Sequence, residues 1–179
     1  LRIERHYHSE RESTMSHMID ESNGRPAMAF TGETPWHNLG AELQPGQDLD
    51  TWRKAAGLDW TVCESPLLYQ NGEIKRWDAR KVLYRSDNGN PLSVMGKDFS
   101  VVQPADVLGL YEEIAKAGGF QLETAGALDG GRRIWALAKV SDGADVVNGD
   151  RVRPYVLLAT SFDGTLATIA KFTTVRVVC

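Results

Sequence analysis

The sequence has few cysteines, no long apolar run and no excess of positive charge. Its 179 residues include two cysteines, too few for a disulfide scaffold or a four-cysteine zinc site. The longest apolar stretches, such as residues 155–159, have the length of a strand, whereas a transmembrane helix needs about 20 apolar residues. The net charge of −4 excludes a strongly basic nucleic-acid clamp. No apolar signal-peptide segment is present, so we expect a cytoplasmic protein without membrane association.

Both ends of the chain are unusual. Residues 1–26 begin with many charged side chains and histidines and show little apolar periodicity, which predicts a charged N-terminal arm. The chain closes on residues 175–179, an apolar, strand-like run that no turn or polar tail follows. Because an unpaired strand edge promotes aggregation, we expect residues 27–179 to form a single α+β domain that is truncated at its C-terminus.

Turn signals predict hairpins. Four Asn-Gly or Asp-Gly pairs each separate two runs of strand-forming residues, at positions 71–72, 88–89, 129–130 and 163–164. These pairs adopt the positive φ of tight hairpin turns at little cost. Four such signals predict a mainly antiparallel sheet built from hairpins. A fifth pair, Asn148-Gly149, lies in the polar stretch 141–150, which we predict to be a loop.

Two segments carry helix signals. Asp48 is a candidate N-cap for a short helix over residues 48–56, and Gly57 fits the stop after it. A longer helix is predicted over residues 104–117, where Pro104 suits the first turn and apolar side chains recur at helical spacing. Groups of strands with one long helix between them predict an α+β fold, in which the helices cover one face of the sheet.

Positive charge is concentrated in the last part of the sequence. Residues 1–130 contain 13 basic and 20 acidic side chains, a net charge of −7, whereas residues 131–179 contain 7 basic and 4 acidic ones, a net charge of +3. Aromatic side chains lie between these cations, a combination that is typical of proteins that bind single-stranded nucleic acid. The candidate nucleic-acid-binding residues are Arg132, Arg133, Trp135, Lys139, Arg151, Arg153, Lys171 and Arg176.

The period of two in residues 132–140 sorts side chains between two faces. Arg133, Trp135 and Lys139 share one face, and the apolar residues Ile134 and Ala136 belong to the other. On this prediction, a tryptophan lies next to two cations. The alternative is a half-buried strand whose tryptophan belongs to the core and whose charges surround its ends.

A second candidate site is formed by Glu33, Trp36 and His37. A histidine beside a glutamate would act as a proton shuttle. In the structural alternative, Trp36 packs as an anchor, Pro35 fixes a turn and His37 caps a backbone group. No pattern specifies a reaction, so we favour a protein without catalytic activity. The four histidines and two cysteines have no spacing typical of a metal site, and we expect neither metal nor cofactor.

Segments spread over residues 27–179 also carry a family resemblance. They comprise residues 29–40 (AFTGETPWHNLG), 55–60, 95–99, 102–104, 123–126, 130–138 and 172–179 (FTTVRVVC). These segments resemble a family of phage- and plasmid-like proteins of unknown function, domain-of-unknown-function family nine hundred and thirty-two. Its members typically continue past the position of Cys179, which agrees with a truncated chain. The resemblance implies a mobile-element origin and no defined activity.

Two functions remain open on the sequence. The first is a nucleic-acid-binding accessory factor of a phage, plasmid or prophage, with single-stranded nucleic acid as its partner. The alternative is a protein-interaction or self-assembly module without catalysis, for example a homo-oligomer. That alternative rests on the strand-like ending, the charged arm and the five tryptophans, because aromatic residues are favoured at interfaces.

Overall fold

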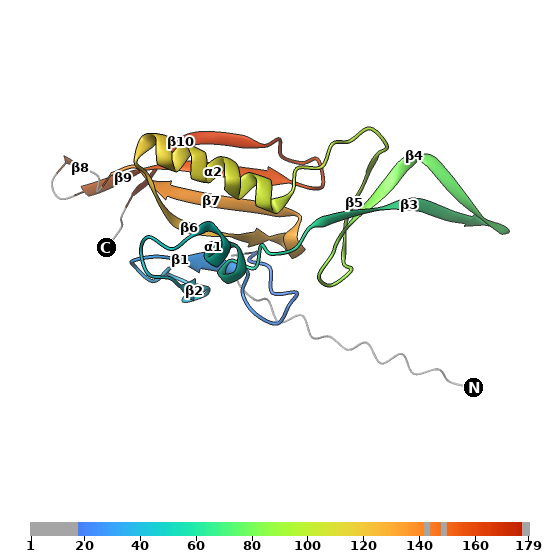
Figure 1. The fold of residues 1–179 in the computed structure, drawn as a ribbon, viewed down its shortest axis with the longest axis horizontal. Coiled ribbons are helices and arrows are strands. Elements are labelled where there is room, and N and C mark those ends of the chain that lie inside the picture. Colours follow the sequence, from blue (N-terminus) through green and yellow to red (C-terminus); the bar gives the residue numbers. More distant parts are fainter. Residues whose placement is uncertain (1–17, 142–143, 148–149, 177–179) are drawn as a thin grey trace.

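The computed structural model describes residues 18–141, 144–147 and 150–176 (Figure 1). These residues form an α+β fold with two helices and mostly antiparallel sheets, which confirms the predicted fold class. The helices are α1 (Leu49–Ala55) and α2 (Pro104–Gly118). The strands are β1 (Met28–Phe30), β2 (Ala41–Glu42), β3 (Val62–Asn71), β4 (Glu73–Arg85), β5 (Pro91–Gly96), β6 (Gln121–Leu128), β7 (Arg133–Lys139), β8 (Ala144–Val147), β9 (Asp150–Ser161) and β10 (Ile169–Arg176).

The strands divide between two sheets. The main sheet has the order β10-β9-β7-β6-β1-β2, with β8 paired to β9, and the smaller sheet has the order β3-β4-β5. All of these pairs are antiparallel except β1 with β2, which is parallel. The four predicted turns each join two paired strands, and Gly72 and Gly164 both have a φ of 75° that suits glycine.

The predicted loop over residues 141–150 is wrong in part. β8 lies in this stretch and pairs with the start of β9. Residues 141–150 are mostly polar, so their sequence did not predict a strand. β8 forms because the chain turns back and pairs with the start of β9. The Asn148-Gly149 pair lies outside the described residues.

Both helices cover the same face of the main sheet (Figure 1). The Asp48 side chain caps α1 by accepting a hydrogen bond from the Thr51 backbone at 2.8 Å, as the sequence predicts. α2 ends where Gly119 turns into the left-handed conformation, and its apolar stripe buries Val107, Leu108 and Tyr111 against the sheet. Within the described ranges, neither helix is long and apolar enough to cross a membrane.

The N-terminal part of the described chain forms β1 and a bridge at Ile19, neither of which the sequence predicted. β1 inserts between β6 and β2 in the main sheet, and Ile19 forms a bridge with Leu128. The structure describes residues 18–26 of the predicted arm, and Ile19 and Asp20 join this stretch to the fold. Asp20 among them is 4% exposed. The first 17 residues of that arm lie outside the described residues.

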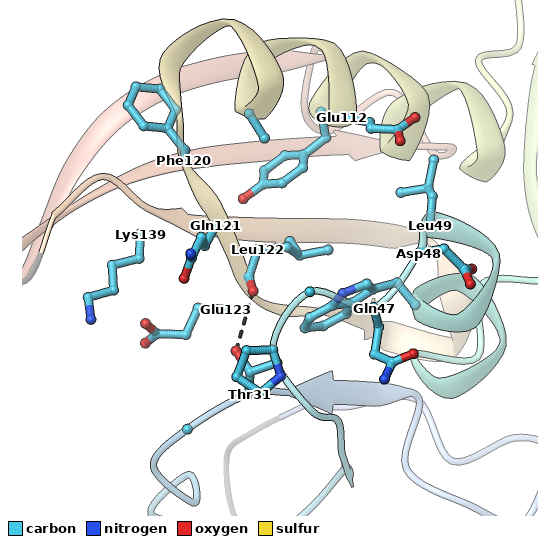
Figure 2. A pocket seen from close by; sticks show the side chains of 16 residues that line it. Thr31, Gln47, Asp48, Leu49, Glu112, Phe120, Gln121, Leu122, Glu123 and Lys139 are labelled. Carbon is cyan, nitrogen blue, oxygen red and sulfur yellow. Dashed lines mark hydrogen bonds between the residues drawn. The ribbon is translucent and has the colours of Figure 1, made fainter.

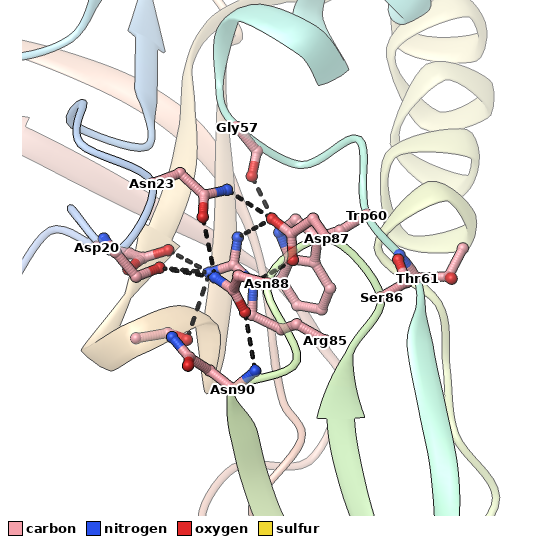
Figure 3. A network of polar contacts seen from close by, with 12 residues as sticks. Asp20, Asn23, Gly57, Trp60, Thr61, Arg85, Ser86, Asp87, Asn88 and Asn90 are labelled. Atoms are coloured by element: carbon pink, nitrogen blue, oxygen red, sulfur yellow. Dashed lines mark hydrogen bonds and ion pairs between the residues drawn. The ribbon is translucent and has the colours of Figure 1, made fainter.

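A buried arginine joins this N-terminal segment to the smaller sheet. Arg85, the last residue of β4, is 1% exposed and donates hydrogen bonds to the carboxylates of Asp20 and Asp87 (Figure 3). Its guanidinium also lies over the ring of Trp60, 4.5 Å from the ring centroid. A buried arginine needs such partners, since an unpaired charge in the interior is strongly destabilising.

The smaller sheet extends away from the main sheet as a two-stranded ribbon (Figure 1). β5 pairs with β4 only from Arg80 to Tyr84, so β3 and β4 continue alone over residues 67–77, which we call the projecting ribbon. All residues from 68 to 80 are exposed. Apolar side chains lie on both faces of the ribbon: Leu67, Tyr69 and Trp77 on one, Leu68 and Ile74 on the other.

Candidate functional site

The sheet face opposite the helices gathers five of the predicted nucleic-acid-binding residues. The strand registers pair Arg133 with Ser161, Lys139 with Tyr155, and Leu157 with Lys171. Because paired side chains point to the same side, these registers unite five residues that we call the basic face: Arg133, Trp135, Lys139, Arg153 and Lys171. The alternation predicted for β7 is confirmed, since Ile134, Ala136 and Ala138 are buried on the helix side.

Of the remaining predicted cations, the structure describes only the side chain of Arg132. Arg132 precedes β7, is exposed, and lies 3.8 Å from the carboxylate of Asp129. Arg151 and Arg176 lie in β9 and β10, but their side chains are outside the described ones. The alternation predicted for β7 therefore groups Arg133, Trp135 and Lys139 on one face and leaves Arg132 outside it.

Acidic groups reduce the positive charge at two edges of the basic face. Arg153 forms an ion pair with Glu33 at 3.0 Å. Arg133 donates a weak hydrogen bond to the Thr165 hydroxyl at 3.4 Å, beside Asp163. Partial burial alone would raise the pKa of Asp163, but hydrogen bonds from Thr165, with the charge of Arg133, hold this pKa below its ordinary value.

The predicted tryptophan lies on the basic face, whereas the other aromatic side chains between the cations do not offer an exposed ring there. Trp135 is half-buried on the basic face, whereas Tyr155 on the same face is buried and donates a hydrogen bond to Glu123 at 2.6 Å. Burial, this hydrogen bond and the Glu123 charge raise the pKa of Tyr155 to about 12. Phe162 belongs to the core, and Phe172 lies on the helix side, where its ring meets that of Phe120. The faces on which these rings lie depend on how β9 and β10 pair with their neighbours, which the sequence of one strand does not predict.

In the second predicted site, Glu33 and His37 make contacts that stabilise the local fold. Glu33 pairs with Arg153, and His37 accepts a hydrogen bond from the Leu39 backbone at 3.1 Å through Nδ1, as the capping interpretation predicts. Trp36 does not pack as an anchor: it is 73% exposed and touches the His37 ring edge-on. Across the described ranges, no group of three or more His, Cys, Asp or Glu side chains could hold a metal ion.

A cavity of about 350 Å³, which the sequence did not predict, lies beside the basic face (Figure 2). It is enclosed by the start of α1, the second half of α2, the start of β6 and the loops around Thr31 and Gln47. Trp52, Tyr111 and Phe120 form its apolar walls. Lys139 lines the cavity and also belongs to the basic face. Separate segments of the chain form this cavity, so no local pattern could have revealed it.

Comparison with known proteins gives a family but no activity. Residues 91–179 match the family model described as Domain of unknown function (DUF932). No curated protein and no solved structure matches the chain. The matched segment runs from β5 through α2 to the C-terminal strands, and therefore includes the strands that carry the basic face. Just under half of the chain, residues 91–179, therefore resembles the DUF932 family.

Proposed function

We propose that this protein binds single-stranded nucleic acid on its basic face, as an accessory factor of a mobile element. The observation that carries the proposal is the register of β7, β9 and β10, which sets Arg133, Lys139 and Lys171 around Trp135. Cations at such spacing contact phosphates, and a tryptophan on a sheet stacks on bases whatever their sequence. The resemblance to phage- and plasmid-like proteins supports the mobile-element setting, and the cytoplasm predicted from the sequence is the compartment that this function requires.

The charge distribution favours weak, salt-sensitive binding to a flexible strand. Glu33 and Asp163 lie beside Arg153 and Arg133, and their negative charges reduce the attraction of these two arginines for phosphate. A half-buried tryptophan offers part of its ring to a base without a deep slot. A single strand can bend to bring its bases to this ring, whereas the bases of a duplex are stacked inside it.

Fluorescence anisotropy with a labelled single-stranded oligonucleotide tests the proposal. We expect binding at low salt that weakens as salt increases, because bound cations replace the counterions of the phosphates. The double substitution Arg133→Ala and Lys139→Ala leaves two phosphates without a cation. It should therefore lower the slope of log affinity against log salt by about 1.4, at about 0.7 for each of these phosphates. Absence of binding at any salt concentration would exclude this function.

A matched variant controls for net charge. Lys75→Ala with Arg76→Ala removes two cations from the projecting ribbon, outside the basic face. This variant should keep most of the affinity and of the salt slope. If both double variants weaken binding equally, general charge rather than the basic face binds the strand.

Self-assembly is a second candidate function, which the projecting ribbon favours. Its two faces expose Leu68 (57%) and Ile74 (73%) on one side and Tyr69 and Trp77 on the other. An isolated two-stranded ribbon is marginally stable in water, so contact with the ribbon of a second copy would stabilise it. Light scattering should then give the mass of a dimer, and Leu68→Thr with Ile74→Thr should give a monomer. A monomeric parent protein would rule this candidate out.

A further inference from the structure

Tyr111 lines the cavity beside the basic face and carries a buried hydroxyl without a partner among the described residues. Tyr111 is 1% exposed, and none of the described residues places a donor or acceptor within hydrogen-bond distance of its hydroxyl. Burial, with the nearby charge of Glu123, raises the pKa of Tyr111, so the hydroxyl stays protonated at neutral pH and can donate. Unpaired polar groups in a protein interior are rare because they lower stability. A ligand that hydrogen-bonds this hydroxyl would remove that cost.

The walls of the cavity suit a flat ring. Trp52 and Tyr111 are almost fully buried, and together with Phe120 they present aromatic surface to the interior. Aromatic side chains stack with planar ligands in offset or edge-to-face geometry. The volume of about 350 Å³ lies at the lower end of the range for small-molecule sites, which is enough for a nucleoside.

The charged groups of the cavity select the polarity of the ligand. Asp48, Glu112 and Glu123 line the cavity with Lys139, so acidic groups outnumber basic ones (Figure 2). Each carboxylate already has one partner: the Thr51 backbone, Lys116 and Tyr155, respectively. A carboxylate has two oxygens and accepts several hydrogen bonds, but it donates none. The part of a ligand that enters is therefore neutral or cationic and rich in donors, and a phosphate stays outside.

We propose that this cavity binds a nucleobase that carries an exocyclic amino group, as in adenosine or cytidine. The ring packs against the aromatic walls, the amino group donates to a carboxylate, and the Tyr111 hydroxyl pairs with a ring nitrogen. Lys139, shared with the basic face, is placed to meet a phosphate at the outside of the cavity. The site is independent of the proposed function, because a free nucleoside and a base within a strand would both satisfy it.

Saturation-transfer NMR on the full chain tests the site with four nucleosides. Adenosine and cytidine should receive saturation and bind at least fivefold more tightly than inosine and uridine, which have an oxygen in place of the amino group. Equal transfer to all four, or transfer to none, would overturn the proposal. Displacement of adenosine by an oligodeoxyadenylate would identify a strand as the source of the base, and its failure would identify the free nucleoside.

Tyr111→Phe separates a ligand role from a structural one. The substitution removes the unpaired hydroxyl and keeps the ring, so the melting temperature of the ligand-free protein should stay the same or rise. Adenosine affinity should fall roughly three- to tenfold, the effect of one missing hydrogen bond. Tyr69→Phe on the projecting ribbon is the matched control and should change neither quantity. A Tyr111→Phe protein that melts earlier and binds adenosine unchanged would contradict the site.

Discussion

The main sheet and the projecting ribbon are both antiparallel and both closed by turns that contain glycine, but they differ in how their apolar residues are placed. In β7, buried apolar residues alternate with half-buried ones, so one face packs under α2. In the ribbon, apolar residues lie on both faces and no helix covers either, and every residue from 68 to 80 is exposed. Turn chemistry makes a hairpin in both places, whereas a one-sided apolar pattern is what attaches a hairpin to a core.

The largest expected effect comes from the arginine that joins the two regions. Arg85→Met removes a charge that pairs with the buried Asp20, and the carboxylate left behind should cost about 3–5 kcal/mol of unfolding free energy. Urea denaturation followed by circular dichroism measures it. The same substitution on the ribbon, Arg76→Met, breaks an exposed pair with Asp78 and should cost at most about 1 kcal/mol. An equal decrease in unfolding free energy in the two variants would contradict a stabilising role for the buried Arg85–Asp20 pair.

A core truncation should separate the two regions next. Leu158 in β9 is fully buried under the helices, so Leu158→Ala should cost about 2–5 kcal/mol through reduced burial and a new cavity. Ile74 on the ribbon is mostly exposed, and Ile74→Ala should change stability by less than about 0.5 kcal/mol. The same denaturation experiment compares them. A large loss from Ile74→Ala would show that the ribbon packs against a partner.

Low pH should weaken the interaction of Asp87 with the buried Arg85 more than the exposed ion pair beside the ribbon. Partial burial alone would raise the pKa of Asp87, but hydrogen bonds from Arg85 and Asn23 and the Arg85 charge hold this pKa below its ordinary value. A carboxylate with a lowered pKa stabilises the fold fully above its unfolded pKa of about 3.9, and this contribution is lost as the pH falls through the folded pKa. Unfolding free energies measured from pH 7 down to pH 3 should therefore decrease less steeply in Asp87→Asn than in the parent.

Asp78→Asn, next to the ribbon, is the control for this pH dependence. Asp78 is paired with Arg76 at 2.6 Å, but both side chains are largely exposed. Its substitution should leave the decrease in stability at low pH unchanged, since exposed pairs are screened by solvent. A flatter pH profile in Asp78→Asn than in Asp87→Asn would reverse the assignment.

Removing the ribbon should have the smallest effect. Deletion of residues 67–77 leaves Asp78-Ala79-Arg80 as a short loop between Pro66 and Lys81, which already face each other in register. Little buried surface is removed, so the melting temperature should shift by less than about 4 °C, the equivalent of about 1 kcal/mol for a chain of this size. Thermal denaturation followed by circular dichroism measures this shift. A decrease of more than about 10 °C, well above that range, would show that the ribbon stabilises the main sheet.

The features that the sequence predicted correctly are encoded within a few neighbouring residues. Asn71-Gly72 and Asp163-Gly164 form turns because their own backbone preferences suffice. The two faces of β7 follow from its strict alternation, and the cap of α1 follows from Asp48 alone. Each of these features depends on neighbouring residues and not on contacts with distant parts of the chain.

The features that the sequence did not predict depend on contacts between distant segments. β1 has only three residues, and it exists because β6, far along the chain, offers an edge to pair with. The buried Tyr155 donates a hydrogen bond to Glu123, which lies at a register shift in β6 between Leu122 and Thr124. Tyr111 fits the apolar stripe of α2 equally well whether its hydroxyl meets core or cavity. Helical periodicity predicts which face of the helix carries a side chain, but it does not predict what surrounds the polar atom at the end of that side chain.

β1 lies outside residues 91–179, the segment that the family model matches. The matched segment begins at Pro91, so it contains β6 but neither β1, which pairs along the edge of β6, nor Trp52 of the cavity wall. The matched segment and the main sheet therefore have different boundaries in this molecule. A relative that inherited only the matched segment would present the edge of β6 unpaired, and a strand from another source would have to occupy it.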